Sequence, residues 1–150
     1  MIDLSAFEAD CRRDIPLLDA MQLSLHSFDH LTLKLDAPLA PNINNKGTAF
    51  GGSIASICLF AGWAVATLAF TDHGIGNTEI VVYQSEMTFK RPARGHLDVV
   101  ARLDPEEFED RLAQLRQGND ERLRFEVDID LHHDGMCCAT MRGVYVVWLK

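Results

Sequence analysis

The sequence lacks an excess of basic residues. Its 150 residues include 14 lysines and arginines against 22 aspartates and glutamates, which gives a formal net charge of -8 at pH 7. Binding of nucleic acid over an extended surface needs a concentrated Lys/Arg face that neutralises phosphates, and the sequence shows no such face. This composition argues against broad nucleic-acid binding. It also means that an anionic ligand needs a local basic cluster, working against the field of the whole chain.

Metal-ligand spacing is also lacking. The six histidines form no ligand pattern at helical spacing, and His132 and His133 would point to opposite faces of a strand. Of the four cysteines, Cys137 and Cys138 are adjacent, so a disulfide between them would be strained. We therefore expect reduced core thiols, no metal site and no cofactor.

The first 21 residues, "MIDLSAFEADCRRDIPLLDAM", lack a basic segment followed by an apolar one, which is the pattern of a signal peptide. We expect a cytoplasmic protein. Linkers, internal repeats and low-complexity tracts are lacking too, and the length fits one domain, since domains usually hold roughly 100 to 150 residues. The prediction is a single domain over residues 1–150.

One long apolar run is present. Residues 53–70, "SIASICLFAGWAVATLAF", approach the roughly 18 to 20 residues that cross a bilayer. A membrane span is the alternative interpretation. The run contains small and polar residues such as Ser56, Gly62 and Thr67, and it has no basic flank. It therefore favours a helix that a sheet buries on all sides.

The other elements follow from local patterns. Residues 4–21 predict one or two short helices, and the alternation of Leu31, Leu33 and Leu35 predicts one strand beginning near residue 23. Two strand-like runs, "EIVVYQSEMTFKRP" and "GHLDVVARL", are separated by "RPARG", which predicts a turn. A helix capped by Asp104 ends at Gly118, and an alternating strand follows over residues 122–132. A final strand, "MCCATMRGVYVVWLK", completes the chain, and its Gly143 predicts a bulge or a close backbone approach. A helix that is apolar on its whole circumference needs a curled sheet around it, which predicts an α+β fold.

Turn-forming residues are concentrated just before the apolar run, in "NINNKGTAFGGSIAS" over residues 42–56. Asn and Gly tolerate positive φ, so the pattern predicts an ordered loop. We expect the buried helix to begin near Ser53, with the Ser53 hydroxyl as its N-cap.

The same stretch carries a family resemblance. The matching residues are Pro41, Asn42, Asn44, Gly47-Thr48, Phe50-Gly51-Gly52-Ser53, Gly62-Trp63, Arg91-Pro92, Gly143, Tyr145, Val146 and Val147. In these residues the chain resembles the acyl-CoA thioesterases of the hot dog fold, in the thioesterase-like group found alone or fused to an acetyltransferase. The resemblance implies a homodimer, with a tetramer as a further assembly, and an acyl thioester bound at the subunit interface.

Backbone N–H groups at a helix N-terminus can stabilise the oxyanion that forms when a thioester is attacked. We expect the N–H of Gly52, with that of Gly51 or Ser53, to polarise the carbonyl; the alternative is that the two glycines only allow close packing. Further candidates on the substrate or a bound water are Asn42, Asn44, Thr48, Phe50 and Ser56, although an Asx-turn or a bond to the helix backbone would also occupy the Asn and Ser side chains.

The general base is missing from its expected place. The resemblance implies an acidic or polar residue about one turn along the helix, but Leu59 stands there and residues 53–70 contain no carboxylate. Glu86 is the remaining candidate, from a strand position that could reach the helix N-terminus of the partner subunit; exposure on the outer face of its strand is the alternative.

A basic cluster of Lys90, Arg91 and Arg94 follows the strand that contains Glu86, and it matches the phosphates of coenzyme A. The combined prediction is an acyl-CoA hydrolase with an acyl pocket lined by Phe50, Phe60 and Trp63. The alternative is a non-catalytic acyl-CoA binding or sensing protein that has lost the base.

Overall fold

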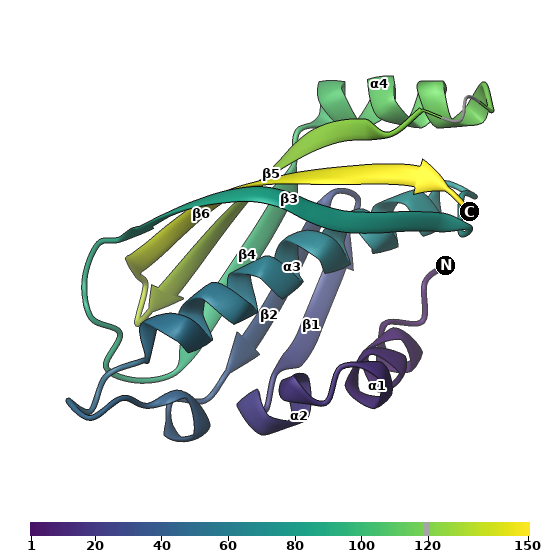
Figure 1. Cartoon of the computed structure of the whole chain (residues 1–150). Coiled ribbons are helices and arrows are strands. Elements are labelled where there is room, and N and C mark those ends of the chain that lie inside the picture. Colours follow the sequence, from purple (N-terminus) through teal and green to yellow (C-terminus); the bar gives the residue numbers. More distant parts are fainter. Residues whose placement is uncertain (119–120) are drawn as a thin grey trace.

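The computed structural model describes residues 1–118 and 121–150 and shows a long helix wrapped by a curled antiparallel sheet (Figure 1). In chain order, the elements are α1 (Leu4–Asp14), α2 (Leu17–Met21), β1 (Ser24–Asp29), β2 (Thr32–Ala37), the 3-10 turn η1 (Ala40–Asn42), α3 (Gly51–Asp72), β3 (Thr78–Phe89), β4 (Leu97–Leu103), α4 (Pro105–Arg116), β5 (Leu123–His133) and β6 (Met136–Leu149). The predicted α+β architecture is confirmed.

The six strands pair in the order β1-β2-β4-β5-β6-β3, and every pair is antiparallel. Strands β1 and β3 are therefore the two edges. The predicted turn at "RPARG" is wrong as a connection between neighbouring strands, because residues 90–96 carry the chain from the β3 edge to a position between β2 and β5. Strand β4 finds its partners there, far from β3.

The first strand was also predicted incorrectly. In place of one strand from residue 23, β1 and β2 form a hairpin in which Asp29 pairs with Thr32. His30 adopts a φ of 53° at the turn. Asn, Asp and His reach this left-handed region more readily than other non-glycine residues, but they adopt it too rarely for a histidine to mark a turn.

Helix α3 lies in the concave face of the sheet and forms the core with it. By length and composition α3 could cross a membrane, but 67% of its most apolar window is buried inside the fold, which favours the core interpretation. The helix begins at Gly51, and its N-cap residue Phe50 makes no side-chain capping bond. The prediction of a Ser53 cap is therefore wrong, since Ser53 lies inside the first turn.

Two glycines accommodate the ring of Tyr145, a fully buried residue of β6. A Cβ on Gly62 of α3 would lie 2.6 Å from Tyr145 Cζ, and a Cβ on Gly143 would lie 2.5 Å from Cε2. Of the two roles predicted for Gly143, the structure shows the close approach, here with the Tyr145 ring, and no register shift at that residue among the described pairs. The tyrosine hydroxyl donates a hydrogen bond to the Leu59 carbonyl at 2.8 Å, which joins the sheet to the middle of α3.

Helix α4 closes one end of this core. Its predicted cap is confirmed, because the Asp104 carboxylate accepts a hydrogen bond from the Glu107 N–H at 2.9 Å. Phe108 of α4 packs on Phe70, near the C-terminal end of α3, with ring centroids 5.0 Å apart. The N-terminal end of α3 lies at the other end of the molecule, beside the loop that precedes it (Figure 1).

Candidate functional site

Asn44 organises the loop that leads into α3. Its Oδ1 accepts hydrogen bonds from the N–H groups of Lys46 (2.8 Å) and Thr48 (3.1 Å). Its Nδ2 donates to Thr48 Oγ1 at 2.9 Å and to the Ala49 carbonyl at 3.4 Å. A carboxamide has two donor hydrogens and two acceptor lone pairs, so these bonds use all of them. The geometry gives Asn44 the Asx-turn role and leaves it no group for the substrate or water contact that was predicted.

Asn42 is also directed into the protein. It is 1% exposed, and its Nδ2 donates to the carbonyls of Met21 and Pro38, both at 2.9 Å. The Asn42 carbonyl accepts the Phe50 N–H at 2.7 Å, which fixes the chain just before α3 begins. Thr48 is buried as well. The structure therefore places both predicted substrate contacts inside the loop, where they hold its shape.

The N-terminus of α3 is open. Its first helical bond runs from the Ile54 N–H to the Phe50 carbonyl at 3.0 Å. Within the part of the chain that the structure describes, no acceptor lies in hydrogen-bond geometry to the N–H groups of Gly51, Gly52 or Ser53. The first N–H groups of a helix need partners and carry the positive end of its dipole. The predicted carbonyl-binding donors are thus available for an oxygen with developing negative charge.

Two exposed aromatic rings flank these donors. Phe50 is 56% exposed, and its ring lies so close to Gly52 that a Cβ there would be 2.9 Å from Cζ. Phe89, at the end of β3, is 55% exposed, and a Cβ on Gly51 would lie 3.6 Å from its ring. Sequence reasoning missed Phe89. The sequence predicts a strand that contains Phe89, but it does not show which face of that strand lies against α3.

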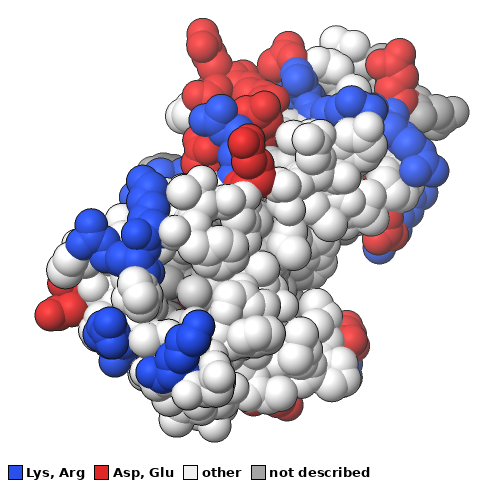
Figure 2. Space-filling model, turned by 60° about the vertical axis from the view of Figure 1, so that its left-hand side comes forward, with Lys and Arg blue, Asp and Glu red and all other residues white. Residues whose placement is uncertain are grey.

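The predicted cations lie next to this aromatic pair. Lys90 and Arg91 directly follow Phe89, and the segment is tied to the loop by the hydrogen bond from the Ala49 N–H to the Ala93 carbonyl at 2.9 Å. Lys90, Arg91 and Arg94 are exposed, and none makes an ion pair among the described residues. Figure 2 shows a group of basic side chains with few acidic neighbours at the left of its view.

An apolar groove of about 420 Å³ begins one helical turn further along α3. It is lined by Ile15, Leu17, Leu18, Met21, Ser56, Leu59, Phe60, Trp63, Ile80, Val81, Val82 and Tyr145. The Ser56 hydroxyl donates to the Gly52 carbonyl at 2.8 Å, the backbone bond expected for a serine in a helix. Phe60 and Trp63 line the groove as predicted, but the exposed Phe50 belongs to the helix N-terminus instead.

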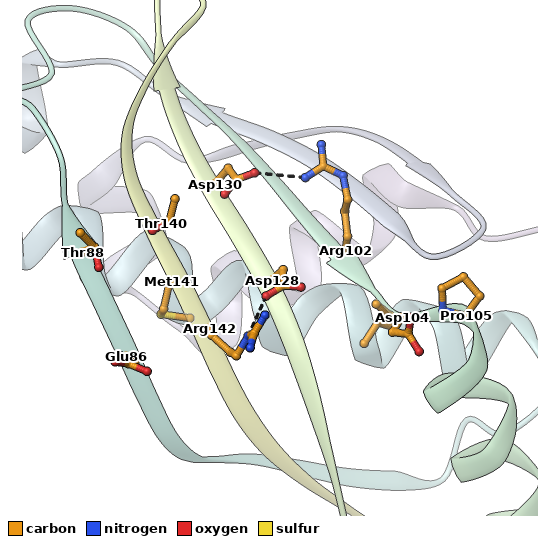
Figure 3. A pocket seen from close by; sticks show the side chains of 11 residues that line it. Glu86, Thr88, Arg102, Asp104, Pro105, Asp128, Asp130, Thr140, Met141 and Arg142 are labelled. Carbon is orange, nitrogen blue, oxygen red and sulfur yellow. Dashed lines mark hydrogen bonds and ion pairs between the residues drawn. The ribbon is translucent and has the colours of Figure 1, made fainter.

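Glu86 lies on the wrong side of the sheet for contact with α3. Its cross-strand partner is Arg142, and both side chains are exposed on the outer face (Figure 3). Arg142 in turn donates to Asp128 at 3.1 Å. The next residue, Met87, packs against the core on the helix side. Within one chain the structure therefore separates Glu86 from the loop and from α3, and its contact with the helix of a partner subunit stays a prediction.

Two of the four thiols, Cys11 and Cys58, are excluded as nucleophiles, whereas Cys137 is only half-buried and departs from the predicted core position. All four cysteines are free, and Cys58 of α3 is fully buried. Burial raises the pKa of the Cys58 thiol to about 12 and that of Cys11 to about 11. Only the thiolate is a strong nucleophile, so both groups behave as core residues, as predicted.

Comparisons with known proteins agree with this geometry. Residues 4–149 match the YiiD_C family, described as "Putative thioesterase (yiiD_Cterm)". A protein described as "putative thioesterase" from Shewanella oneidensis is 27% identical, with a TM-score of 0.81 over 97% of this chain and 96% of that one.

Two more distant structures share the fold. A protein of unknown function from Chlorobaculum tepidum is 24% identical, with a TM-score of 0.88 over 97% of this chain and 94% of that one. A thioesterase from Haemophilus influenzae is 14% identical, with a TM-score of 0.78 over 99% and 92%. The chain therefore belongs to the YiiD_C thioesterase family and has the hot dog fold.

Proposed function

We propose that the protein hydrolyses acyl-CoA as a homodimer, with the acyl carbonyl bound by the N–H of Gly52 and its neighbours. The observation that carries this proposal is the uncapped N-terminus of α3, which lies between an apolar groove and a basic segment. Those three features match the three parts of an acyl-CoA: the carbonyl, the chain and the phosphates. The coenzyme A carrier and the dimer go beyond what family membership states.

The reaction needs stabilisation of charge on the carbonyl oxygen. Water attacks the carbonyl carbon and forms a C–O bond, the oxyanion collapses, the C–S bond breaks, and the leaving thiolate takes the proton from the water. Each N–H donor placed at the oxyanion lowers the activation free energy by roughly 2.7 to 4 kcal/mol. Since the Ser56 hydroxyl donates to Gly52, its lone pairs remain to accept a hydrogen bond from the attacking water. With Leu59 in the groove and Glu86 outside, we expect slow turnover.

The groove fits the acyl chain. Its lining is almost wholly apolar, and it opens beside Ser56, one turn from the proposed carbonyl site. Each buried CH₂ contributes about 0.8 kcal/mol, or about fourfold in kcat/KM if that binding is kept in the transition state. Substrate preference should therefore rise with chain length until the groove is full.

Trp63 is expected to limit that length. Its ring lines the groove beside Phe60, with ring centroids 5.9 Å apart, and stacks on Phe7 at 6.0 Å, which holds the indole in place at the groove wall. Trp63→Ala should shift the preferred acyl chain to a longer one, with about a fourfold gain for each additional CH₂ that becomes buried. Initial rates on a series of saturated acyl-CoAs measure this shift. An unchanged chain-length profile would remove the groove from substrate binding.

The basic segment is expected to recognise the phosphates of the carrier. Arg91→Ala/Arg94→Ala should raise KM for acyl-CoA roughly tenfold, since each charge-assisted hydrogen bond contributes about 1.5 to 3 kcal/mol in favourable geometry and less when exposed. The same acyl group on pantetheine, which lacks those phosphates, should be hydrolysed equally well by wild type and variant. An equal rise in KM for the acyl-CoA and for the acyl-pantetheine would contradict a phosphate-binding role.

The dimer is supported by the difference between the two sheet edges. At the β1 edge, the Leu25 N–H donates to the Glu8 carboxylate of α1 at 2.8 Å, and Arg12 donates to the Leu23 carbonyl. The β3 edge has no such cover among the described residues, and its Val81, Val82 and Tyr83 are exposed. A long apolar edge strand invites pairing with another chain. We infer that two β3 strands pair antiparallel about a two-fold axis, which joins the sheets.

A double charge on that edge should break the dimer. Val81→Lys/Tyr83→Lys places two like-charged pairs near the two-fold axis, and the expected result is a dimer weaker by up to about 30-fold, since opposed like charges cost up to about 1 kcal/mol for each pair. Sedimentation equilibrium measures the change. Ser27→Lys, on the exposed part of β1, is the matched control and should leave the dimer intact. Dissociation by the control alone would assign the interface to β1.

The experiment that tests the proposed activity is hydrolysis of short, medium and long acyl-CoAs, measured as the release of free thiol.

A second function, acyl-CoA binding without turnover, is favoured by Leu59 at the position where the base was expected and by the outward direction of Glu86. Saturable binding with no thiol release from any substrate would select it. Thiol release that Gly52→Ala loses would select the hydrolase.

A further inference from the structure

Four side chains from separate parts of the sequence converge on the outer face of the sheet, across β1, β2 and β4. His26 Nε2 lies 2.7 Å from Asp36 Oδ2, and His96 Nε2 lies 2.6 Å from the same oxygen. Asp98 completes the cluster, since one ligand atom each from Asp36, His96 and Asp98 lies within 4.8 Å of the others. We propose that this cluster binds a divalent transition-metal ion of the zinc class, with Asp36, His96 and Asp98 as its ligands and His26 beside Asp36.

The charges of the cluster favour a cation. Asp36 and Asp98 are direct cross-strand partners in the β2–β4 pair, and like charges in that position destabilise a sheet. A divalent cation bound between the two carboxylates would relieve this repulsion.

The donor atoms indicate which ion. Imidazole nitrogens together with a carboxylate suit zinc, cobalt, nickel and copper, whereas magnesium and calcium prefer oxygen ligands only. Ligand atoms of a tetrahedral zinc site are about 3.3 Å apart when the bonds are about 2.0 to 2.1 Å long. His96 Nε2 and Asp36 Oδ2, which are 2.6 Å apart, need to separate by about 0.7 Å to admit an ion. The His96 side chain is 52% exposed, so it has the freedom to move.

The backbone around the cluster is well fixed. Asp36 lies on β2 between β1 and β4, with Ser24 and Asp98 as its cross-strand partners. The His96 carbonyl lies 3.1 Å from His133 Nδ1, which holds the end of the 90–96 connection against β5. A bound ion would therefore join two segments that lead to the candidate site: the end of β2 before the loop, and the end of the basic segment. It would stabilise the folded state, because the ligands are dispersed in the unfolded chain.

Zinc binding tests the proposal, with Zn²⁺ itself as the probe. Calorimetric titration of the wild-type protein should show one Zn²⁺ per chain, and Zn²⁺ at 100 times its Kd should raise the unfolding midpoint by roughly 5 to 10 °C. His26→Ala/His96→Ala should weaken binding at least about 100-fold, more than the loss of an outer-shell partner. His30→Asn is the matched control. His30 is 92% exposed on the same hairpin and lies outside the cluster, so its loss should leave Zn²⁺ binding unchanged.

NMR of the wild-type protein gives a second measurement that does not depend on how the variants fold. Zn²⁺ should shift the imidazole resonances of His26 and His96 and leave those of His30 in place, and Mg²⁺ should shift none of them. Equal Zn²⁺ affinity in wild type and the double variant would overturn the proposal. So would a wild-type titration without heat or resonance shifts, which would leave the two histidines as hydrogen-bond partners of Asp36 alone.

Discussion

Gly52→Ala is expected to lower kcat/KM for acyl-CoA hydrolysis by about 100- to 1,000-fold, the loss that follows removal of one oxyanion donor. The new Cβ would lie 2.9 Å from Phe50 Cζ and still closer to Cε2. Because Phe50 is largely exposed, its ring can turn aside and the chain still folds. The methyl group and the displaced ring then occupy the space in front of the Gly52 N–H, where the thioester carbonyl has to approach. Steady-state kinetics on one acyl-CoA measures the loss.

Gly51→Ala is the matched control for this experiment. Its Cβ would make an ordinary contact of 3.6 Å with the Phe89 ring, and the N–H groups of the first turn would remain accessible. We expect near-wild-type rates and unchanged thermal unfolding. If folded Gly52→Ala keeps the activity of wild type and of Gly51→Ala, the Gly52 N–H does not bind the reacting carbonyl. The proposed oxyanion site would then have to be abandoned.

The central helix and the last two strands could be predicted because their signals are local. A long apolar run without charges, the unbroken alternation of residues 122–132 and the apolar, β-branched run that ends the chain leave few other structures for those residues. The order of strands could not be predicted in this way. Strand β3 pairs with β6, and β4 lies on the other side of the sheet, although β3 and β4 are neighbours in the sequence. That order is set by how the sheet closes around α3, which no local pattern contains.

The position of Glu86 shows how one residue can reverse a prediction. Counting by twos from buried Ile80 places Glu86 on the helix side. In the structure, Val82 pairs with Tyr145 and Gln84 with Val144, so Tyr83 is an extra residue in β3. A bulge of one residue exchanges the two faces of the strand beyond it, and Glu86 turns outward. The sequence contains no glycine or proline that marks this bulge.

The candidate site was predicted in position but only partly in role. The loop and helix start were recognised from their glycines and asparagines. The roles of Asn42 and Asn44 depend on acceptors such as the Met21 carbonyl, which approach only after folding. The cluster of His26, Asp36 and His96 was missed for the same reason, since its members come from different strands and show no spacing along the chain.

The second large effect concerns stability. Gly62→Ala is expected to reduce the free energy of unfolding by about 2 to 4 kcal/mol, or to lower the unfolding midpoint by roughly 5 to 15 °C, as overpacking of a close-packed core does. The added Cβ would lie 2.6 Å from Tyr145 Cζ and 2.8 Å from Cε2. Tyr145 has no room to retreat, because it is fully buried, packs on Phe125 and donates its hydroxyl hydrogen to Leu59. Differential scanning calorimetry measures the change.

Gly76→Ala provides the comparison, because a Cβ there would have no neighbour within 4 Å and the residue does not have a positive φ. Gly76→Ala should change the free energy of unfolding by no more than about 0.5 kcal/mol, as surface substitutions usually do. Since Tyr145 also lines the groove, the Gly62→Ala protein that remains folded at low temperature should lose its preference among acyl chain lengths before it loses hydrolysis. Equal stability of the two alanine variants would show that α3 and β6 can separate without cost at this contact, and the groove would then not be the rigid pocket that chain-length selection requires.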